Sequence, residues 1–251
     1  MVTPVLIGGA SLAGRRFGHQ VGGWLVALPL TSGPVAFFLA TDEGASFAAS
    51  AAVGMLAATL SQVAFALAYG WSSRRGALSA FLCGFVAFAA ATVVLSFLHW
   101  RATGTFVLVL GSLAVGYAVT RRRGASEALS EPTELPRWDI PARMVAATMV
   151  VVVITTLAPV LGSHLAGLLS PFPVFATVLA VFTHHRHGAS AATSTLDGLV
   201  LGLLAPAVFF LVLSVTLPAV GLLGFGFATA AAFAAHALSL LAIPRVQQPP
   251  V

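Results

Sequence analysis

Long apolar stretches, separated by short charged or glycine-containing breaks, run through almost the whole chain. Most of them are about 20 residues or longer, which is the length that an α-helix needs to cross a bilayer core. The pattern predicts an all-α, polytopic integral membrane protein. The predicted spans are 21–41, 45–71, 76–99, 103–120, 142–161, 164–183, 189–216 and 218–243.

A shorter apolar segment at 1–14 precedes these spans. As a helix it would reach only about 21 Å, which is less than the bilayer core of about 30 Å. One alternative is that it tilts or thins the bilayer and forms a ninth transmembrane helix. The other is that it lies in the interface, so that the protein has eight transmembrane helices.

The composition excludes several classes of protein. The chain has 251 residues, of which 59% are hydrophobic and 8% are charged, whereas a soluble domain carries about 25% charged residues. A water-soluble enzyme and a disordered chain are therefore both excluded. The single cysteine, Cys83, lies in an apolar run, so no disulfide or cysteine-based metal site is expected. We expect no cofactor, and the absence of a Walker A pattern means that the chain does not hydrolyse ATP by itself.

The basic residues indicate the orientation of the helices. All twelve are arginines, and they fall on one side of the membrane if the helices alternate, with Arg101 as the exception. Asp42 and Glu43 fall on the other side. The positive-inside rule then places the chain in the inner membrane with a cytoplasmic carboxyl terminus, and with the amino terminus outside if 1–14 spans. Because the arginines are dispersed, we expect no nucleic-acid binding. The arginines of the cytoplasmic side are Arg15, Arg16, Arg74, Arg75, Arg121, Arg122, Arg123, Arg137, Arg143, Arg186 and Arg245.

An internal repeat appears when the chain is shifted by 144 residues. Residues 18–67 then align with 162–211 without a gap, and 15 of 50 positions are identical. Glycine and proline matches are the informative ones, because they mark backbone features rather than hydrophobicity. The alternative is a chance resemblance between apolar segments of low complexity. Informative matches are Gly18 with Gly162, Gly23 with Gly167, Pro29 with Pro173, and Gly44 with Gly188.

The repeat predicts two units of four helices with inverted topology. The span 103–120 has no counterpart, and one extra crossing between the units turns the second upside down relative to the first. This plan is common among secondary transporters, and it resembles the architecture of carriers with crossed, interrupted helices, such as bile-acid-transporter-like folds. Lipid is the expected surrounding, and the glycine- and alanine-rich surfaces are compatible with a homodimer. The predicted units are repeat 1 (1–100), an extra helix (101–120), a cytoplasmic linker (121–141), repeat 2 (142–243) and a cytoplasmic tail (244–251).

Prolines interrupt the matched helices at matched places. Such breaks free backbone carbonyls, which hydrocarbon cannot satisfy, so they are tolerated only inside protein or beside a wet cavity. Ser32 can cap a new half-helix, whose positive dipole end would favour an anionic group. The alternative is an ordinary kink that aids packing. The predicted substrate-binding residues are Pro29, Thr31, Ser32, Gly33, Pro34, Ser170, Pro171 and Pro173.

Two titratable residues inside the spans are candidates for a proton or a coupling ion. Asp197 is the only acidic residue deep in a predicted span, where a carboxylate must be paired, protonated or hydrated. Alternatively, the helix starts near Ser194 and Asp197 lies at its hydrated end. His236 lies inside the last span; it pairs with Asp197 or hydrogen-bonds to a backbone carbonyl.

The other histidines are less informative. His184, His185 and His187 flank Arg186, and we expect a solvated cytoplasmic loop there rather than a metal site or a pH sensor. His19 precedes the first full span, where it lines an entry vestibule or lies at the interface.

These features favour a small secondary transporter or permease. It would move a small polar or anionic solute by alternating access, with proton or sodium coupling left open. The alternative is a non-catalytic scaffold or an accessory subunit of a larger complex. An intramembrane enzyme is less favoured, because the spans contain neither two aspartates nor a nucleophile motif nor clustered metal ligands.

Overall fold

Most residues that the computed structural model describes are helical, and none of them forms a strand. The described residues are 2–29, 32–98, 101–123, 140–145, 148–149 and 172–241. Residues 140–145 and 148–149 are helical and carry no label. The labelled elements are α1 (Val2–Phe17), α2 (His19–Leu25), α3 (Ser32–Asp42), α4 (Ala45–Ser72), the 3₁₀ turn η1 (Ser73–Arg75), α5 (Ala77–Ser96), α6 (Ala102–Arg123), α8 (Val174–Gly202), α9 (Leu204–Val220) and α10 (Leu223–Leu240).

Five helical stretches of the described chain are long and apolar enough to cross a membrane. Large apolar side chains project outwards from several of them, including Val86 of α5, Leu108 of α6 and Phe233 of α10. A surface of this kind suits lipid rather than water. The prediction of a helical membrane protein is confirmed. The five stretches are Ala45–Arg75, Ala77–Ser96, Ala102–Thr120, Val174–Val220 and Leu223–Leu240.

Several predicted spans agree closely with single helices. The spans 45–71, 76–99 and 103–120 correspond to α4, α5 and α6. Each is bounded by glycine or charged residues, which end an apolar run clearly.

The predicted span 21–41 is interrupted, as its prolines predict: α2 ends at Leu25 and α3 begins at Ser32. Pro29 lies in this break, where it removes a backbone donor. The predicted span 189–216 corresponds to the second arm of α8 and to α9, which meet at Leu203 with helical φ and ψ. Most of 142–161, of the linker 121–141 and of the tail 244–251 lies outside the described residues, as does the first part of 164–183.

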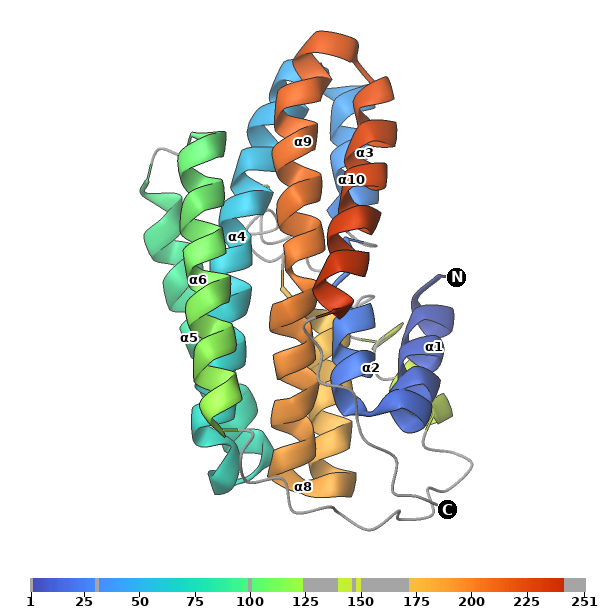
Figure 1. Ribbon diagram of the computed structural model, residues 1–251, viewed down its shortest axis with the longest axis vertical. Helices are drawn as coiled ribbons and strands as arrows, with labels where there is room; N and C mark the ends of the chain where they lie inside the picture. Colours follow the sequence, from blue (N-terminus) through green and yellow to red (C-terminus); the bar gives the residue numbers. More distant parts are fainter. Residues whose placement is uncertain are drawn as a thin grey trace.

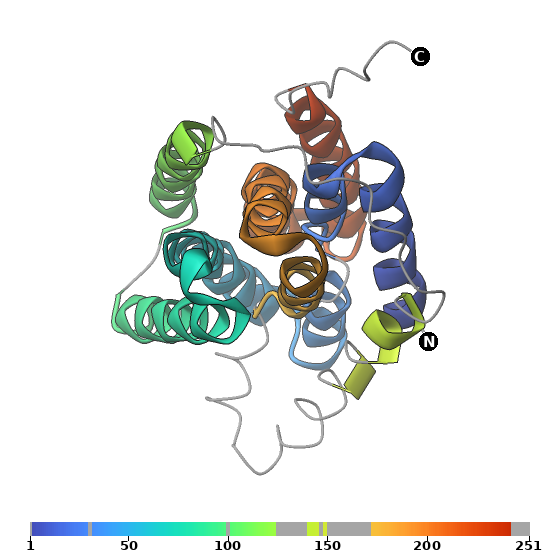
Figure 2. The same ribbon diagram turned by 90° about the horizontal axis from the view of Figure 1, so that it is seen from below.

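Glycines with positive φ make the sharp reversals between helices. Gly18, Gly44, Gly76 and Gly188 have φ values of 96°, 92°, 105° and 83°, and each combines them with an extended ψ. Side chains other than glycine rarely tolerate this conformation. At Gly188 the chain folds back, so that α8 consists of two arms, 174–187 and 189–202, lying side by side (Figures 1 and 2).

The helices surround a centre formed by α4, α8 and α9. Figure 2 shows α5 and α6 on one side of this centre, and α1, α2 and α10 on the other. The largest fully buried side chains include Phe65 and Tyr69 of α4, Leu199 of α8 and Leu213 of α9. The core thus lies where these three helices meet.

Charged ends of the helices are segregated. The turn between α3 and α4 follows Asp42 and lies at the top of Figure 1. The 3₁₀ turn η1, which contains Arg74 and Arg75, lies at the bottom together with the reversal inside α8. Basic and acidic ends therefore occupy opposite ends of the bundle, as the alternation of charge along the chain predicts.

Helix α2 packs unusually closely against the second arm of α8. A Cβ atom added at Gly23 would overlap the backbone carbonyl of Thr195, and one added at Gly198 would overlap the carbonyl of Gln20. At Gly202 it would lie 2.6 Å from the carbonyl oxygen of Trp24. Glycines spaced four residues apart, here Gly198 and Gly202, let two helix backbones touch. Such close backbone contact leaves no room for a side chain.

We predict that Gly198→Ala destabilises the protein by about 1–3 kcal/mol, because the added methyl group must displace α2. The matched control is Gly54→Ala at the aligned position of α4, where a Cβ meets no atom within 4 Å. That change should be neutral or stabilise by up to about 1 kcal/mol through helix propensity. Thermal unfolding of the detergent-solubilised protein measures both. Equal unfolding temperatures for the two variants would contradict the close contact.

Candidate functional site

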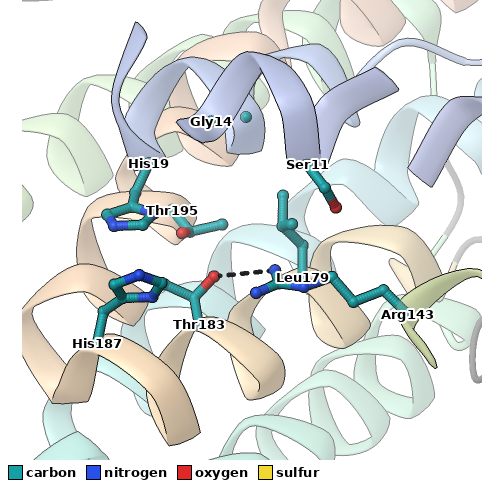
Figure 3. A pocket seen from close by; sticks show the side chains of 9 residues that line it. Ser11, Gly14, His19, Arg143, Leu179, Thr183, His187 and Thr195 are labelled. Carbon is teal, nitrogen blue, oxygen red and sulfur yellow. Dashed lines mark hydrogen bonds between the residues drawn. The ribbon is translucent and has the colours of Figure 1, made fainter. Parts of the chain in front are cut away.

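A small polar cavity lies where α1, α2, both arms of α8 and the helical segment 140–145 meet. Its volume is about 10 Å³, which is room for roughly one water molecule. Figure 3 shows its polar side chains converging from these elements. The lining residues are Ser11, Gly14, His19, Gly22, Arg143, Leu179, Thr183, His187 and Thr195.

Arg143 is the strongest charge in this cavity. Its side chain is only 3% exposed, its Nη1 donates a long hydrogen bond of 3.4 Å to Thr183 Oγ1, and its Cζ lies 5.4 Å from the centre of the Phe182 ring. The sequence placed Arg143 among the arginines of the cytoplasmic side and did not predict that it would be buried. A buried guanidinium retains its charge, so its surroundings must stabilise a cation.

Two histidines face each other beside this arginine. The ring centres of His19 and His187 are 4.7 Å apart, with the planes tilted by 54°. His187 is part of the first arm of α8 and is only partly exposed. The prediction of a solvated loop at 184–187 was wrong, because helix α8 continues through these residues as far as the reversal at Gly188.

The cavity favours an uncharged His19. Burial, followed by the positive charges of His187 and Arg143, lowers the pKa of His19 from 6.5 to about 4. His19 lies in α2, which is not among the stretches long enough to cross a membrane. Burial and the two neighbouring positive groups thus all favour the neutral imidazole.

Hydroxyl groups complete the wall of the cavity. Thr195 is fully buried, and its Oγ1 donates to the carbonyl of Ala191 at 3.0 Å. Ser11 is 3% exposed, and its Oγ has no hydrogen-bond partner among the described residues. In Figure 3 the Ser11 hydroxyl points towards the cavity. An unsatisfied buried hydroxyl is unfavourable, so a further group within the cavity would stabilise it.

The chemistry of this wall suits an anion. A guanidinium, two imidazoles and three hydroxyls line it, and none of the lining residues carries a carboxylate. A metal cation would be repelled by Arg143, and the described residues contain no group of three metal-ligating side chains.

A second polar cluster lies at the other end of α2. The rings of Trp24 and His236 stack at 3.7 Å with an interplanar angle of 10°, and Trp24 Nε1 donates to Ser239 Oγ at 2.8 Å. His236 is 4% exposed. Its ring nitrogens make no well-formed hydrogen bond within the described residues, to Asp197 or to a carbonyl, although the backbone of Gly202 is close enough to interact with the imidazole.

The predicted substrate-binding residues that the structure describes are not among those lining the cavity. Gly33, at the start of α3, lies near Phe209 of α9, since an added Cβ would be 3.7 Å from its Cζ. Pro173 is buried and caps α8, next to Phe172. Pro29 and Ser32 are partly buried and Pro34 is exposed. Thr31, Ser170 and Pro171 lie outside the described residues.

Asp197 lies on the second arm of α8 and is partly buried. This arm begins at Ala189, directly after the reversal at Gly188. The alternative in which the helix starts near Ser194 is therefore wrong. Asp197 is well inside the helix but is not among the residues that line the cavity.

The cavity could not be predicted from the sequence alone. His19 and the histidines near His187 stood out, but they belong to segments far apart along the chain. Arg143 resembled any other arginine at the end of an apolar run. Only the packing of α2 against α8 distinguishes a buried arginine from an interfacial one.

We predict that His19 makes the stability of the empty protein depend on pH. The unfolded chain takes up a proton on His19 below about pH 6.5, whereas the folded state does so only below about pH 4. Stability should therefore fall as the pH falls from 6.5 to 4 and show no further loss from this group below that. In His19→Gln this part of the fall should disappear, while the exposed control His185→Gln should retain it. Unfolding temperatures between pH 4 and 7.5 test this, and identical curves for wild type and His19→Gln contradict it.

Comparison of the chain with protein-family models, with curated proteins and with solved structures finds no match.

Proposed function

We propose that the protein is a small secondary transporter built from two inverted repeats, which moves a small polar or anionic solute across the inner membrane by alternating access. The observation that carries the proposal is that two helical hairpins, aligned by the sequence repeat, point towards opposite ends of the bundle.

The order and length of the helices agree with the repeat. Shifted by 144 residues, α3 corresponds to 176–186, which falls in the first arm of α8 (174–187). In the same way α4 corresponds to 189–216, covered by the second arm of α8 and by α9, and α5 corresponds to 221–240, covered by α10. Helix α6 has no counterpart in the alignment, and most of the residues aligned with α1 and α2 lie outside the described part of the chain.

The turns of the two hairpins have the same conformation. Gly44 has φ 92° and ψ 167°, and the aligned Gly188 has φ 83° and ψ −178°. In Figure 1 the turn between α3 and α4 is at the top, and the turn within α8 is at the bottom. An odd number of crossings between two copies of one hairpin would produce this inversion.

The two copies also contact each other reciprocally. Phe65 of α4 and Phe209 of α9 are matched by the repeat. Phe65 packs edge-on against Phe172, with ring centres 5.8 Å apart, beside the start of α8. Phe209 lies next to Gly33, at the start of α3. Each phenylalanine thus lies beside the interrupted segment of the other copy, which supports a two-fold relation.

Two half-helices then begin near the middle of the bundle. Helix α3 occupies the upper half of Figure 1 and the first arm of α8 the lower half. Their amino-terminal ends carry partial positive charge, and helices interrupted in this way surround the solute in many carriers. The prolines and glycines of these starts remain the proposed solute-binding region, and Asp197 and His236 remain the proposed proton- or ion-carrying groups.

A labelling experiment tests the inversion. In a Cys83→Ala background, Ser46→Cys and Ser190→Cys place thiols at matched, exposed positions just after Gly44 and Gly188. A membrane-impermeant maleimide should label Ser190→Cys only from the cytoplasmic side and Ser46→Cys only from the opposite side. Labelling of both from one side would overturn the inverted repeat.

Transport itself is tested in proteoliposomes with small inorganic anions and organic acids, with and without a pH gradient. We expect flux for at least one solute, and Asp197→Asn should reduce it about tenfold or more if this carboxylate carries the coupled proton or ion. The matched control is Asp42→Asn, on an exposed acid at the end of α3, which should leave flux unchanged. If no solute moves while the protein remains folded, the accessory-subunit alternative replaces the carrier.

A further inference from the structure

We propose that the protein couples transport to protons through His236, and that Trp24 is a positioning residue that stabilises the charged form of this imidazole. This inference rests on the proposed transport function: it selects the proton among the possible coupling ions and names the residue that carries it. The two rings are stacked, with their centres 3.7 Å apart and their planes 10° from parallel.

The first argument is the burial of His236. Its side chain is 4% exposed, and neither ring nitrogen makes a well-formed hydrogen bond within the described residues. The backbone of Gly202 is close enough to interact with the imidazole. A buried ring with unused hydrogen-bonding capacity is unfavourable. A titratable residue in this state inside a membrane-spanning bundle is typical of a proton pathway.

The second argument is the fixed orientation of Trp24. Its Nε1 donates to Ser239 Oγ at 2.8 Å, and that hydroxyl donates to the backbone carbonyl of His236 at 2.8 Å. The indole is therefore held both by the stack and by a hydrogen bond one turn further along α10. The face of an indole is electron-rich and attracts a cation. The contact thus stabilises an imidazolium more than a neutral imidazole.

The third argument is location. In Figure 1 the upper end of α2 and the lower end of α10 lie near the middle height of the bundle. Trp24 is the last residue but one of α2, and Pro29 follows in the break before α3. The proton-carrying pair is therefore joined by a few residues to the proposed solute-binding region. A movement of α3 around a solute would displace Trp24 relative to His236.

The repeat supplies a matched position without a titratable group. Shifted by 144 residues, His236 corresponds to Thr92 of α5, which is also buried and donates to Ser61 Oγ of α4 at 2.8 Å. Both copies thus have a buried polar side chain at this position. Of the two, only the imidazole can take up a proton near physiological pH.

The other titratable groups on the surrounding helices are few. Helix α9 has none, α3 ends at Asp42, and α2 has His19 at its other end. Helix α8 has 184–187 at the end of its first arm and Asp197 on its second arm. The negative charge of Asp197 favours an imidazolium. A proton from water on one side binds the free electron pair of an imidazole nitrogen, and the same proton leaves to the other side after the helices rearrange.

A fluorescence titration tests the protonation of His236 and needs no solute. In the full-length protein with Trp71→Phe, Trp100→Phe and Trp138→Phe, Trp24 is the single tryptophan. An imidazolium in contact with an indole quenches its emission more strongly than a neutral imidazole does. We expect the emission to fall in one transition as the pH is lowered from 8 to 4, with unchanged helicity by circular dichroism. His236→Gln should remove the transition, whereas His19→Gln and Thr92→Val should retain it.

Flux measurements test the coupling. For a solute that moves in the proteoliposome panel, one coupled proton raises accumulation by up to about tenfold per pH unit of gradient. His236→Gln should abolish this accumulation and leave downhill flux. Trp24→Leu should move the pH of half-maximal flux about one unit towards acid, because the cation–π contact is lost. Trp24→Phe keeps an aromatic face and should move it less, and Trp71→Leu, at an exposed position, should not move it.

Three results would overturn the inference: the Trp24 emission does not change with pH, its transition survives His236→Gln, or gradient-driven accumulation survives that change. None of them affects the labelling of Ser46→Cys and Ser190→Cys or downhill flux. Flux without the transition refutes this inference alone, whereas a folded protein that shows the transition but moves no solute refutes the carrier.

Discussion

The contact between α2 and the second arm of α8 determines where both polar clusters of the bundle form. Hydrophobic association is weak between helices in lipid, so close packing of small residues is a main source of their attraction. Gly23 lies against the backbone of Thr195, and Gly198 lies against that of Gln20. Because the backbones touch, one end of α2 brings His19 to His187 and the other end brings Trp24 to His236.

Sharp reversals at glycines limit the polar backbone that an apolar chain exposes between its helices. The turns between consecutive described helices are short, and backbone groups within hydrocarbon must be satisfied inside the protein. A single glycine with positive φ ends one helix and starts the next with little exposed backbone, as at Gly44 and Gly188. Half-length helices can then pack beside full-length ones. Helix α3 and the first arm of α8 are such elements, resting on α9 and α4 through Phe209 and Phe65.

The arrangement of charge links the two sets of observations. Several arginines lie at one end of the bundle, whereas Arg143 is buried and lines a cavity. Burial, followed by the charges of His187 and Arg143, raises the free energy of protonating His19, so its neutral imidazole lies beside a cation. The Trp24–His236 stack is also buried, with its ring centres 3.7 Å apart.

The sequence by itself determined the class of protein, most helix boundaries and the breaks. Helices α4, α5 and α6 follow from the lengths of their apolar runs, because an apolar segment long enough to cross a bilayer is a helix with few alternatives. The break before α3 follows from Pro29, which lacks a backbone donor. Each of these features depends on the residues of one segment alone, so the sequence of that segment is enough to predict it.

Only the tertiary structure decided the site. Hydropathy treats an arginine near a helix end in the same way whether lipid headgroups, water or protein surround it, so the burial of Arg143 could not be predicted. Likewise, His187 was assigned to a loop because four polar residues in a row usually leave a helix, whereas here α8 continues to Gly188. Burial of these groups depends on elements that contact them from distant parts of the chain, and no local pattern encodes that contact.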